Sequence, residues 1–164
     1  MAIYLRVRIT RLAVRQTALT QLAERVLSAV GGSKLELSLE LIGDRRMRRL
    51  NREYRNNDRS TDVLAFSIRE AVMPPGVRAV TPMLGDVVIS LPTALRQAKE
   101  AGRSIDDELA MLLVHGVLHL CGYDHERNSQ EAARMSRRER ALLQLITPVP
   151  RLVTVRTGRQ TRGR

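Results

Sequence analysis

Three histidines stand within one short stretch of this 164-residue chain, and the chain has no other histidine. His115 and His119 are four residues apart, so on an α-helix their side chains lie on the same face, one turn apart. Gly122 follows at a place where helices favour a residue without a Cβ, and the chain can then turn back to bring His125 to the same point. The spacing therefore predicts a helix that ends in a three-histidine metal site.

Three imidazoles with an open fourth position are typical of catalytic zinc sites, whereas structural sites use four protein ligands. A lone histidine on an apolar helix face is more often a packed core residue, but three at this spacing favour a metal. We expect one zinc ion per chain, held by His115, His119 and His125; nickel, cobalt and copper also accept imidazole. Cys121 has the chemistry of a fourth ligand, but on a continuing helix it points about 240° away from His115.

The same stretch matches the zinc-peptidase pattern His-Glu-x-x-His-x-x-Gly-x-x-His at every position but one. Where those peptidases carry the glutamate that removes a proton from water, this chain has Gly116, which can take no proton. The sequence therefore disfavours a peptidase. Asp124 and Glu126 are the carboxylates nearest the third histidine in sequence, and either could move a proton. We slightly favour Asp124 as a hydrogen-bond partner that orients an imidazole.

The stretch 115–125, His-Gly-Val-Leu-His-Leu-Cys-Gly-Tyr-Asp-His, resembles the signature of the bacterial YbeY family of endoribonucleases, which mature rRNA. Further segments agree with that family. They are residues 50–55 (Leu-Asn-Arg-Glu-Tyr-Arg), 61–67 (Thr-Asp-Val-Leu-Ala-Phe-Ser) and 84–89 (Leu-Gly-Asp-Val-Val-Ile). The likeness covers about residues 35 to 145, and its histidine motif is highly specific.

The resemblance implies a zincin-like fold and a zinc-dependent, single-strand-specific endoribonuclease in 16S rRNA 3′-end maturation and ribosome quality control. Its partners would be single-stranded rRNA and the ribosomal small subunit with its assembly proteins. The resemblance also implies that Arg55 and His115 act in RNA cleavage, although the residues by themselves do not distinguish Arg55 from the arginines around it. The second hypothesis is a non-catalytic, metal-stabilised ribosome assembly factor that binds rRNA without cutting it.

A net charge of +11 indicates a polyanionic partner, since basic side chains displace counterions from a nucleic-acid backbone. Residues 44–55 are predicted to form a helix in which a run of arginines lies opposite the apolar face. From this run we expect Arg48 and Arg52 to bind RNA, together with Arg59 on the following turn. The alternative is an ordinary solvated face, which most charged runs form.

Two kinds of apolar pattern predict the fold. Alternation or short apolar runs predict strands at residues 3–9, 35–41, 61–68 and 84–89. Helical spacing and capping residues predict helices at about 14–30, 44–55, 90–100, 105–121 and 129–146, with a loop at 70–82. This order predicts one α+β domain over residues 1–150, in which a small mixed sheet of about four strands is covered by helices, with the histidine helix packed centrally.

The remaining residues, 151–164, are basic and without periodicity, and we predict a disordered tail. The chain has one cysteine, so no disulfide can form within it, and a reducing compartment is favoured. Its first residues lack the basic-then-apolar order of a secretory signal. The longest apolar run, at 109–121, is too short for a membrane span. We therefore expect a cytoplasmic protein with no membrane and no disulfide partner.

Overall fold

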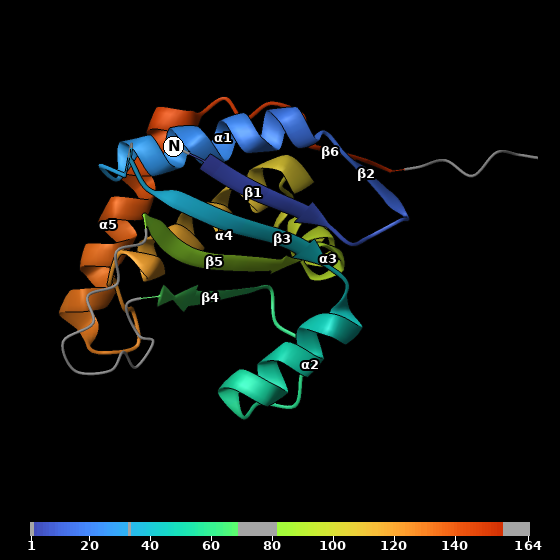
Figure 1. Ribbon diagram of the computed structural model, residues 1–164, viewed down its shortest axis with the longest axis horizontal. Helices are drawn as coiled ribbons and strands as arrows, with labels where there is room; N and C mark the ends of the chain where they lie inside the picture. The colour runs from blue at the N-terminus through green and yellow to red at the C-terminus, as the bar shows by residue number, and fades with distance from the viewer. Residues whose placement is uncertain (1, 33, 69–81, 156–164) are drawn as a thin grey trace, which may run out of the picture.

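The computed structural model describes residues 2–32, 34–68 and 82–155 (Figure 1). Strands and helices alternate in the first half of the chain, and helices dominate the second. In chain order the elements are β1 (Ala2–Val7), β2 (Leu12–Val14), α1 (Gln16–Ala29), β3 (Glu36–Ile42), α2 (Asp44–Arg55), β4 (Val63–Ser67), β5 (Met83–Ser90), α3 (Leu91–Ala101), α4 (Ile105–Leu120), α5 (Ser129–Ile146) and β6 (Val153–Val155). The predicted α+β class is confirmed, and β2 and β6 are additions to it.

Four strands form one mixed sheet in the order β1-β3-β5-β4. β1, β3 and β5 are parallel, and β4 runs antiparallel to β5 at the edge. The alternation of β3 explains its two faces. Leu37, Leu39 and Leu41 are fully buried, whereas Ser38 and Glu40 on the other face stay partly exposed. The predicted small mixed sheet is confirmed.

The histidine helix α4 lies centrally, where it contacts β4 and β5 as well as α1, α3 and α5 (Figure 1). Leu109, Ala110 and Leu118, which at 100° per residue point in different directions from the helix axis, are all fully buried. A helix that is apolar on most sides is stable only where neighbours cover those sides, and here they do. Within the described ranges, no helix is both long and apolar enough to cross a membrane.

Helix α2 packs over a second, smaller apolar cluster, made of Ile42, Met47, Leu64 and Val88 with Leu50 and Phe66 against them. Its first residue, Asp44, fastens the helix to the junction of β5 and α3. Oδ1 of Asp44 accepts hydrogen bonds from Ser90 Oγ at 2.7 Å and Thr93 Oγ1 at 2.6 Å, and Oδ2 pairs with Arg96 at 2.9 Å. Partial burial opposes ionisation of Asp44, but these bonds and the Arg96 guanidinium outweigh it and lower its pKa to about 2.

The C-terminal segment corrects one prediction. β6 pairs antiparallel with β2, and Leu152 just before it is fully buried. Oδ1 of Asp106 accepts the backbone N–H groups of Leu152 and Val153 at 2.6 and 3.0 Å. The prediction that a disordered tail begins at residue 151 is therefore wrong for this segment, because a carboxylate of α4 and a partner strand order it. Residues 156–164 of the predicted tail, and residues 70–81 of the predicted loop, lie outside the described residues.

Candidate metal centre

The local structure around the histidines follows from capping at both ends of α4. At its start, Oγ of Ser104 accepts the backbone N–H of Asp107 at 3.0 Å, as an N-cap does. At its end, Gly122 has a φ of +98°, a left-handed backbone that favours glycine. The N–H of Gly122 donates to the carbonyl of His119 at 3.0 Å, and that of Tyr123 to the carbonyl of Leu118 at 3.1 Å, which together form a Schellman motif. The chain therefore reverses directly after the helix.

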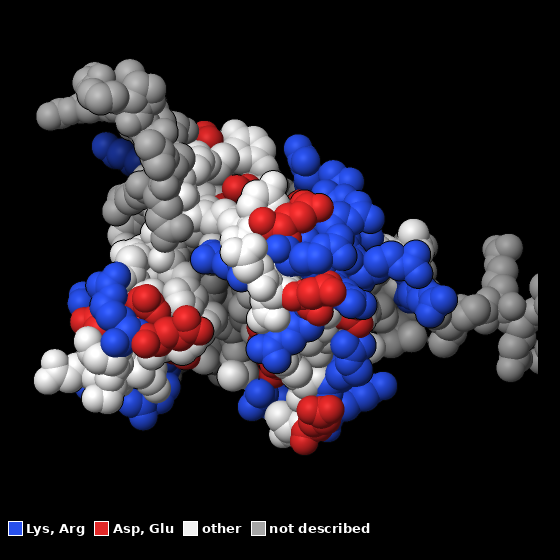
Figure 2. Space-filling model, turned by 90° about the horizontal axis from the view of Figure 1, so that it is seen from below, with Lys and Arg blue, Asp and Glu red and all other residues white. Residues whose placement is uncertain are grey.

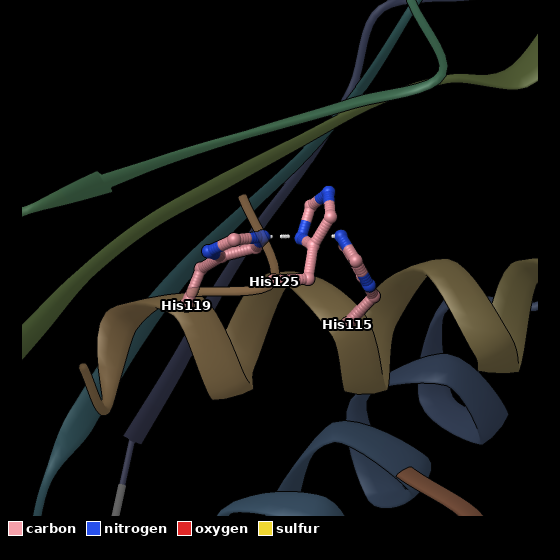
Figure 3. Close-up of side chains that lie close together, drawn as sticks. All are labelled: His115, His119 and His125. Carbon is pink, nitrogen blue, oxygen red and sulfur yellow. Dashed lines mark hydrogen bonds between the residues drawn. The ribbon is translucent and has the colours of Figure 1, made fainter. Parts of the chain in front are cut away.

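This reversal brings the three predicted ligands together (Figure 3). One ring nitrogen from each of His115, His119 and His125 lies within 4.8 Å of the others, and Nε2 of His115 and Nε2 of His119 are 3.1 Å apart. The His115–His119 ring centroids are 4.7 Å apart, and each lies 5.2 Å from that of His125. Three imidazoles that converge on one point could hold a metal ion, and the donor set suits a borderline metal such as zinc.

A carboxylate of helix α5 holds His115 from the side away from this point. Nδ1 of His115 lies 2.6 Å from Oε1 of Glu139, and both side chains are only 29% exposed. Because the contact occupies Nδ1, the lone pair of Nε2 is left to face the other histidines. Carboxylates commonly fix the tautomer and orientation of ligand imidazoles in this way. Glu139 lies 24 residues from His115 in the sequence, and the histidine motif, which ends at His125, does not predict it.

The electrostatics of the cluster favour neutral imidazole at its centre. Burial lowers the pKa of His119, and the neighbouring rings of His115 and His125 lower it further. Asp124 and the backbone of Tyr123 act in the opposite direction and do not cancel the effect. Neutral imidazole is the form that ligates a metal, so His119 needs little preparation for binding.

The carboxylates next to His125 do not take the role that we favoured for Asp124. Oδ1 of Asp124 accepts the backbone N–H of Glu126 at 2.9 Å, which closes the turn. Oε1 of Glu126 lies 3.9 Å from Nε2 of His125, beyond hydrogen-bond distance, and its side chain is exposed. Of the carboxylates in the described ranges, Glu139 is the one hydrogen-bonded to a ligand imidazole. Cys121 packs against the core and, as expected, does not join the ligand group.

Gly116, the position of the peptidase glutamate, faces the sheet. A Cβ at Gly116 would lie 2.7 Å from Cγ1 of Val87 on β5 and 3.4 Å from Cγ2 of Val63 on β4. A side chain at this position would clash with the buried side chain of Val87 unless Val87 moved. The site therefore lacks the peptidase glutamate and also lacks the space for one, so sterics and sequence exclude it alike.

The histidines open into a cleft of about 630 Å³ bounded by α4, the edge strand β4, the C-terminal end of α2 and the turn after α4. Helix α2 contributes Arg55 to its lining. Nη2 of Arg55 donates to the carbonyl of Ala65 at 2.8 Å, and the guanidinium lies 5.6 Å from the centroid of the Phe66 ring. The two anchors fix one side of the guanidinium and leave its remaining donors available. Arg55 and His115, the predicted catalytic pair, thus line the same cleft.

The arginines predicted to bind RNA lie elsewhere. Arg48 donates from Nε and Nη2 to the two oxygens of Asp58, at 2.9 and 3.2 Å, and Nη1 of Arg52 lies 3.7 Å from the same carboxylate. Arg59 is exposed on the turn that follows. Of these three, none belongs to the described residues that line the cleft. A contact with RNA would have to occur outside it.

Known proteins resemble this chain over most of its length. A family model described as "Endoribonuclease YbeY" matches residues 5–147. A protein named Endoribonuclease YbeY from Anaeromyxobacter sp. (strain Fw109-5) is 51% identical over 120 residues, which cover 73% of this chain and 59% of that protein, less than two thirds of its length. Two proteins of the same name are matched more completely. That from Geobacter metallireducens is 46% identical, covering 78% of this chain and 84% of the relative, and that from Aquifex aeolicus is 40% identical, covering 86% and 90%.

The fold also resembles a solved structure. The solution structure of TM1509 from Thermotoga maritima superposes with a TM-score of 0.59, covers 88% of each chain and is 23% identical in sequence. At that identity the likeness concerns the fold alone, and it agrees with the arrangement of sheet and helices described above.

Proposed function

The chain belongs to the YbeY family of endoribonucleases, and from this premise we propose that it cleaves single-stranded RNA at the three-histidine cleft. The observation that carries the proposal is the meeting of two kinds of group in one cleft. His115, His119 and His125 offer a metal site, and Arg55 offers a cation in the lining of the same cleft. Phosphodiester cleavage is accelerated by a group that activates the nucleophile, whether water or the RNA 2′-hydroxyl, and by a positive charge where negative charge builds up on the phosphoryl oxygens.

The histidines and Glu139 form the metal-binding half of the proposal. Zinc is the ion we propose, one per chain, because three imidazoles without a fourth protein ligand match catalytic zinc sites. When bound, zinc would supply Lewis acidity toward water and phosphoryl oxygen. Glu139 keeps Nε2 of His115 turned toward the ion, and the lowered pKa of His119 keeps that ring neutral.

Arg55 forms the substrate half. A planar guanidinium can donate two parallel hydrogen bonds to a phosphate, which makes it better suited than an ammonium to clamp phosphoryl oxygens. Its anchors at Ala65 and Phe66 hold it before the substrate arrives, so less freedom is lost on binding. Arg48, Arg52 and Arg59 belong to the proposal as contacts for RNA outside the cleft.

The biological setting is part of the same proposal. We assign the activity to 16S rRNA 3′-end maturation and ribosome quality control, with the ribosomal small subunit and its assembly proteins as partners. The support is the family relationship together with the net charge of +11, which suits a polyanionic substrate. A cytoplasmic location follows from this setting and agrees with the single cysteine.

Metal analysis and RNA cleavage, measured in parallel on purified variants, test the proposal. We expect the wild type to bind one zinc and to cut a single-stranded rRNA fragment. His119→Ala should lose both properties. Arg55→Ala should keep the metal and cut about 100-fold to 1000-fold more slowly, the usual cost of removing one group that stabilises developing charge. Arg55→Lys should recover little of the cleavage rate, because an ammonium restores the charge but cannot donate two parallel hydrogen bonds to a phosphate.

Two controls make the result decisive. Arg137→Ala removes an exposed arginine of α5 and should change neither metal content nor cleavage, which shows that loss of an arginine does not by itself abolish activity. Thermal melting of each variant shows that the fold is intact. Equal RNA cleavage by the wild type, His119→Ala and Arg55→Ala would contradict the proposal. Metal and rRNA binding by the wild type without any cutting would favour the non-catalytic assembly factor instead.

A further inference from the structure

The outer face of α2 carries arginines that do not line the cleft. At 100° per residue, Arg45, Arg49 and Arg52 project within about 60° of each other, on the side opposite the buried Met47. They are spaced by four and three residues, so they follow one another along the helix. All three are exposed. Figure 2, which views the molecule from below, shows Lys and Arg side chains crowded over the part of the surface where α2 lies.

The acids around α2 neutralise some of these arginines and leave others unpaired. Asp58 is shared by Arg48 and Arg52. Glu40 is shared by Arg8 at 2.8 Å and Arg46 at 3.5 Å. By contrast, Arg45 and Arg49 make no ion pair with any residue in the described part of the chain; the nearest acid on that face of the helix is Glu53, one turn after Arg49. Arg45 and Arg49 are therefore the exposed arginines of α2 that have neither a carboxylate partner nor, as Arg55 has, a carbonyl partner among the described residues, and we call this pair the α2 ridge.

The position of α2 relates the ridge to the cleft. The C-terminal end of the helix, through Asn51 and Arg55, forms one wall of the cleft. Its N-terminal end is fixed to the body of the protein by Asp44. At 1.5 Å per residue, Arg49 lies about 9 Å and Arg45 about 15 Å along the helix axis from Arg55, so the ridge leads away from the cleft end of α2 along its outer face. A polyanion that occupied the cleft could continue along the ridge without leaving the surface.

We propose that the α2 ridge binds the phosphate backbone of the single-stranded RNA that flanks the segment held in the cleft. The proposal rests on the proposed endoribonuclease function and adds to it a place for the RNA beyond the reacting phosphate. Arginine suits this role because its guanidinium donates paired hydrogen bonds to phosphate oxygens, whatever the base. The ridge therefore adds affinity in proportion to RNA length and leaves sequence choice unchanged.

The test uses the full chain loaded with zinc and two lengths of single-stranded probe. DNA oligonucleotides of about 5 and about 16 nucleotides, the range of single-strand binding sites, present the same phosphates and resist a ribonuclease. We expect Arg45→Gln/Arg49→Gln to bind the longer probe more weakly and the shorter one as the wild type does. Because single strands give a slope of about 0.7 per phosphate contact, the variant's slope of log affinity against log salt should fall by about 1.4.

That change of slope has a direct consequence. Between 50 and 200 mM salt, a fourfold change, the affinity advantage of the wild type for the longer probe should shrink about sevenfold. A matched control, Arg137→Gln/Arg151→Gln, removes two exposed arginines on and just after α5 that also lack ion pairs in the described part of the protein. This control should leave the salt slope unchanged. Cleavage of RNAs of the same two lengths should follow the same pattern.

The outcomes separate the two proposals. The proposed RNA binding by the α2 ridge is contradicted if the salt slope of Arg45→Gln/Arg49→Gln is unchanged, or if the slope of the control variant falls equally. Either result counts even where the wild type cuts RNA normally. A length-dependent loss in the α2 variant supports the ridge even where no variant cuts, in which case the endoribonuclease proposal fails alone. An effect seen only with whole ribosomal subunits and not with the naked probes would mean that the ridge contacts a surface of the assembled subunit and not free single strands, and it too overturns the proposal.

Discussion

Glu139 offers a direct test of the metal centre, because its carboxylate holds the imidazole of His115 although it lies outside the histidine motif in the sequence. Glu139→Gln removes the negative charge and preserves the shape of the side chain, and Glu139→Ala removes the contact altogether. Both leave all three imidazoles in place. If Nδ1 of His115 depends on this carboxylate, the variants should bind metal more weakly while the fold survives.

The size of the effect follows from the geometry. The Nδ1 to Oε1 distance of 2.6 Å is typical of a charge-assisted hydrogen bond, and the pair is only 29% exposed, so solvent screens it weakly. Loss of such a supporting carboxylate usually lowers metal affinity about 10-fold to 100-fold, or about 1.4 to 2.7 kcal/mol. We expect Glu139→Gln near the lower limit, since the amide oxygen can still accept a hydrogen bond from the Nδ1–H group of His115, and Glu139→Ala near the upper one.

Competition with a coloured zinc chelator at pH 7 measures this directly. Glu131→Gln makes the same charge change at the start of α5, away from the imidazoles, and serves as the control. Melting of the metal-free proteins checks the fold. Equal zinc affinity in the wild type and Glu139→Ala would refute the reasoning, since it would mean that His115 keeps its orientation without the carboxylate.

Two further predictions concern the scaffold around the site. Because the pKa of Asp44 is lowered from 3.8 to about 2, its contribution to the free energy of unfolding is complete above about pH 5 and is lost as the pH falls through 2. Water screens this carboxylate, which is 35% exposed, so the contribution is about 1 to 1.5 kcal/mol. Urea unfolding of Asp44→Asn should show this loss at pH 7, and a constant difference from the wild type down to pH 2 would contradict it. Gly116→Ala should destabilise the protein by about 1 to 2 kcal/mol, because the clash with Val87 exceeds the gain in helix propensity. Unchanged or higher stability in urea would show that Val87 moves aside freely.

Local rules were enough to place most elements. The alternation that predicted strands at 3–9 and 35–41 corresponds to β1 and β3, and the predicted helix starts at 105 and 129 are those of α4 and α5, where the side chains of Ser104 and Asn128 act as N-caps. Local rules missed β2 and β6, because strands of three residues carry too little pattern. The acidic start of α4 also makes tertiary contacts that no local pattern predicts. Asp106 holds the chain before β6, and the buried Glu108 pairs with Arg103 at 2.8 Å.

The ligand spacing, by contrast, is local, and it suffices to predict that the histidines meet. Glu139, which holds His115 in place, comes from another helix, yet the sequence did contain a signal for this residue. Glu139 lies four residues after Met135 and three before Leu142, both fully or almost fully buried, so it stands on the inward face of α5. A carboxylate on an inward face needs a partner, because an unpaired buried charge is costly. A lone acid on the inward face of a helix is therefore a signal that could have found Glu139.

The arginines of α2 show what no helix pattern can supply. All project from one helix, and its periodicity does not show which of them have partners elsewhere in the fold. Their partners come from elsewhere: Asp58 on the next turn takes Arg48 and Arg52, Ala65 on β4 takes Arg55, and Arg45 and Arg49 are left with no acid among the described residues. An arginine already paired gains less from a phosphate than a free one, since it must first give up its carboxylate. The tertiary contacts therefore distinguish three sets of arginines on α2. Arg55 lines the cleft, Arg48 and Arg52 share Asp58, and Arg45 and Arg49 form the unpaired α2 ridge.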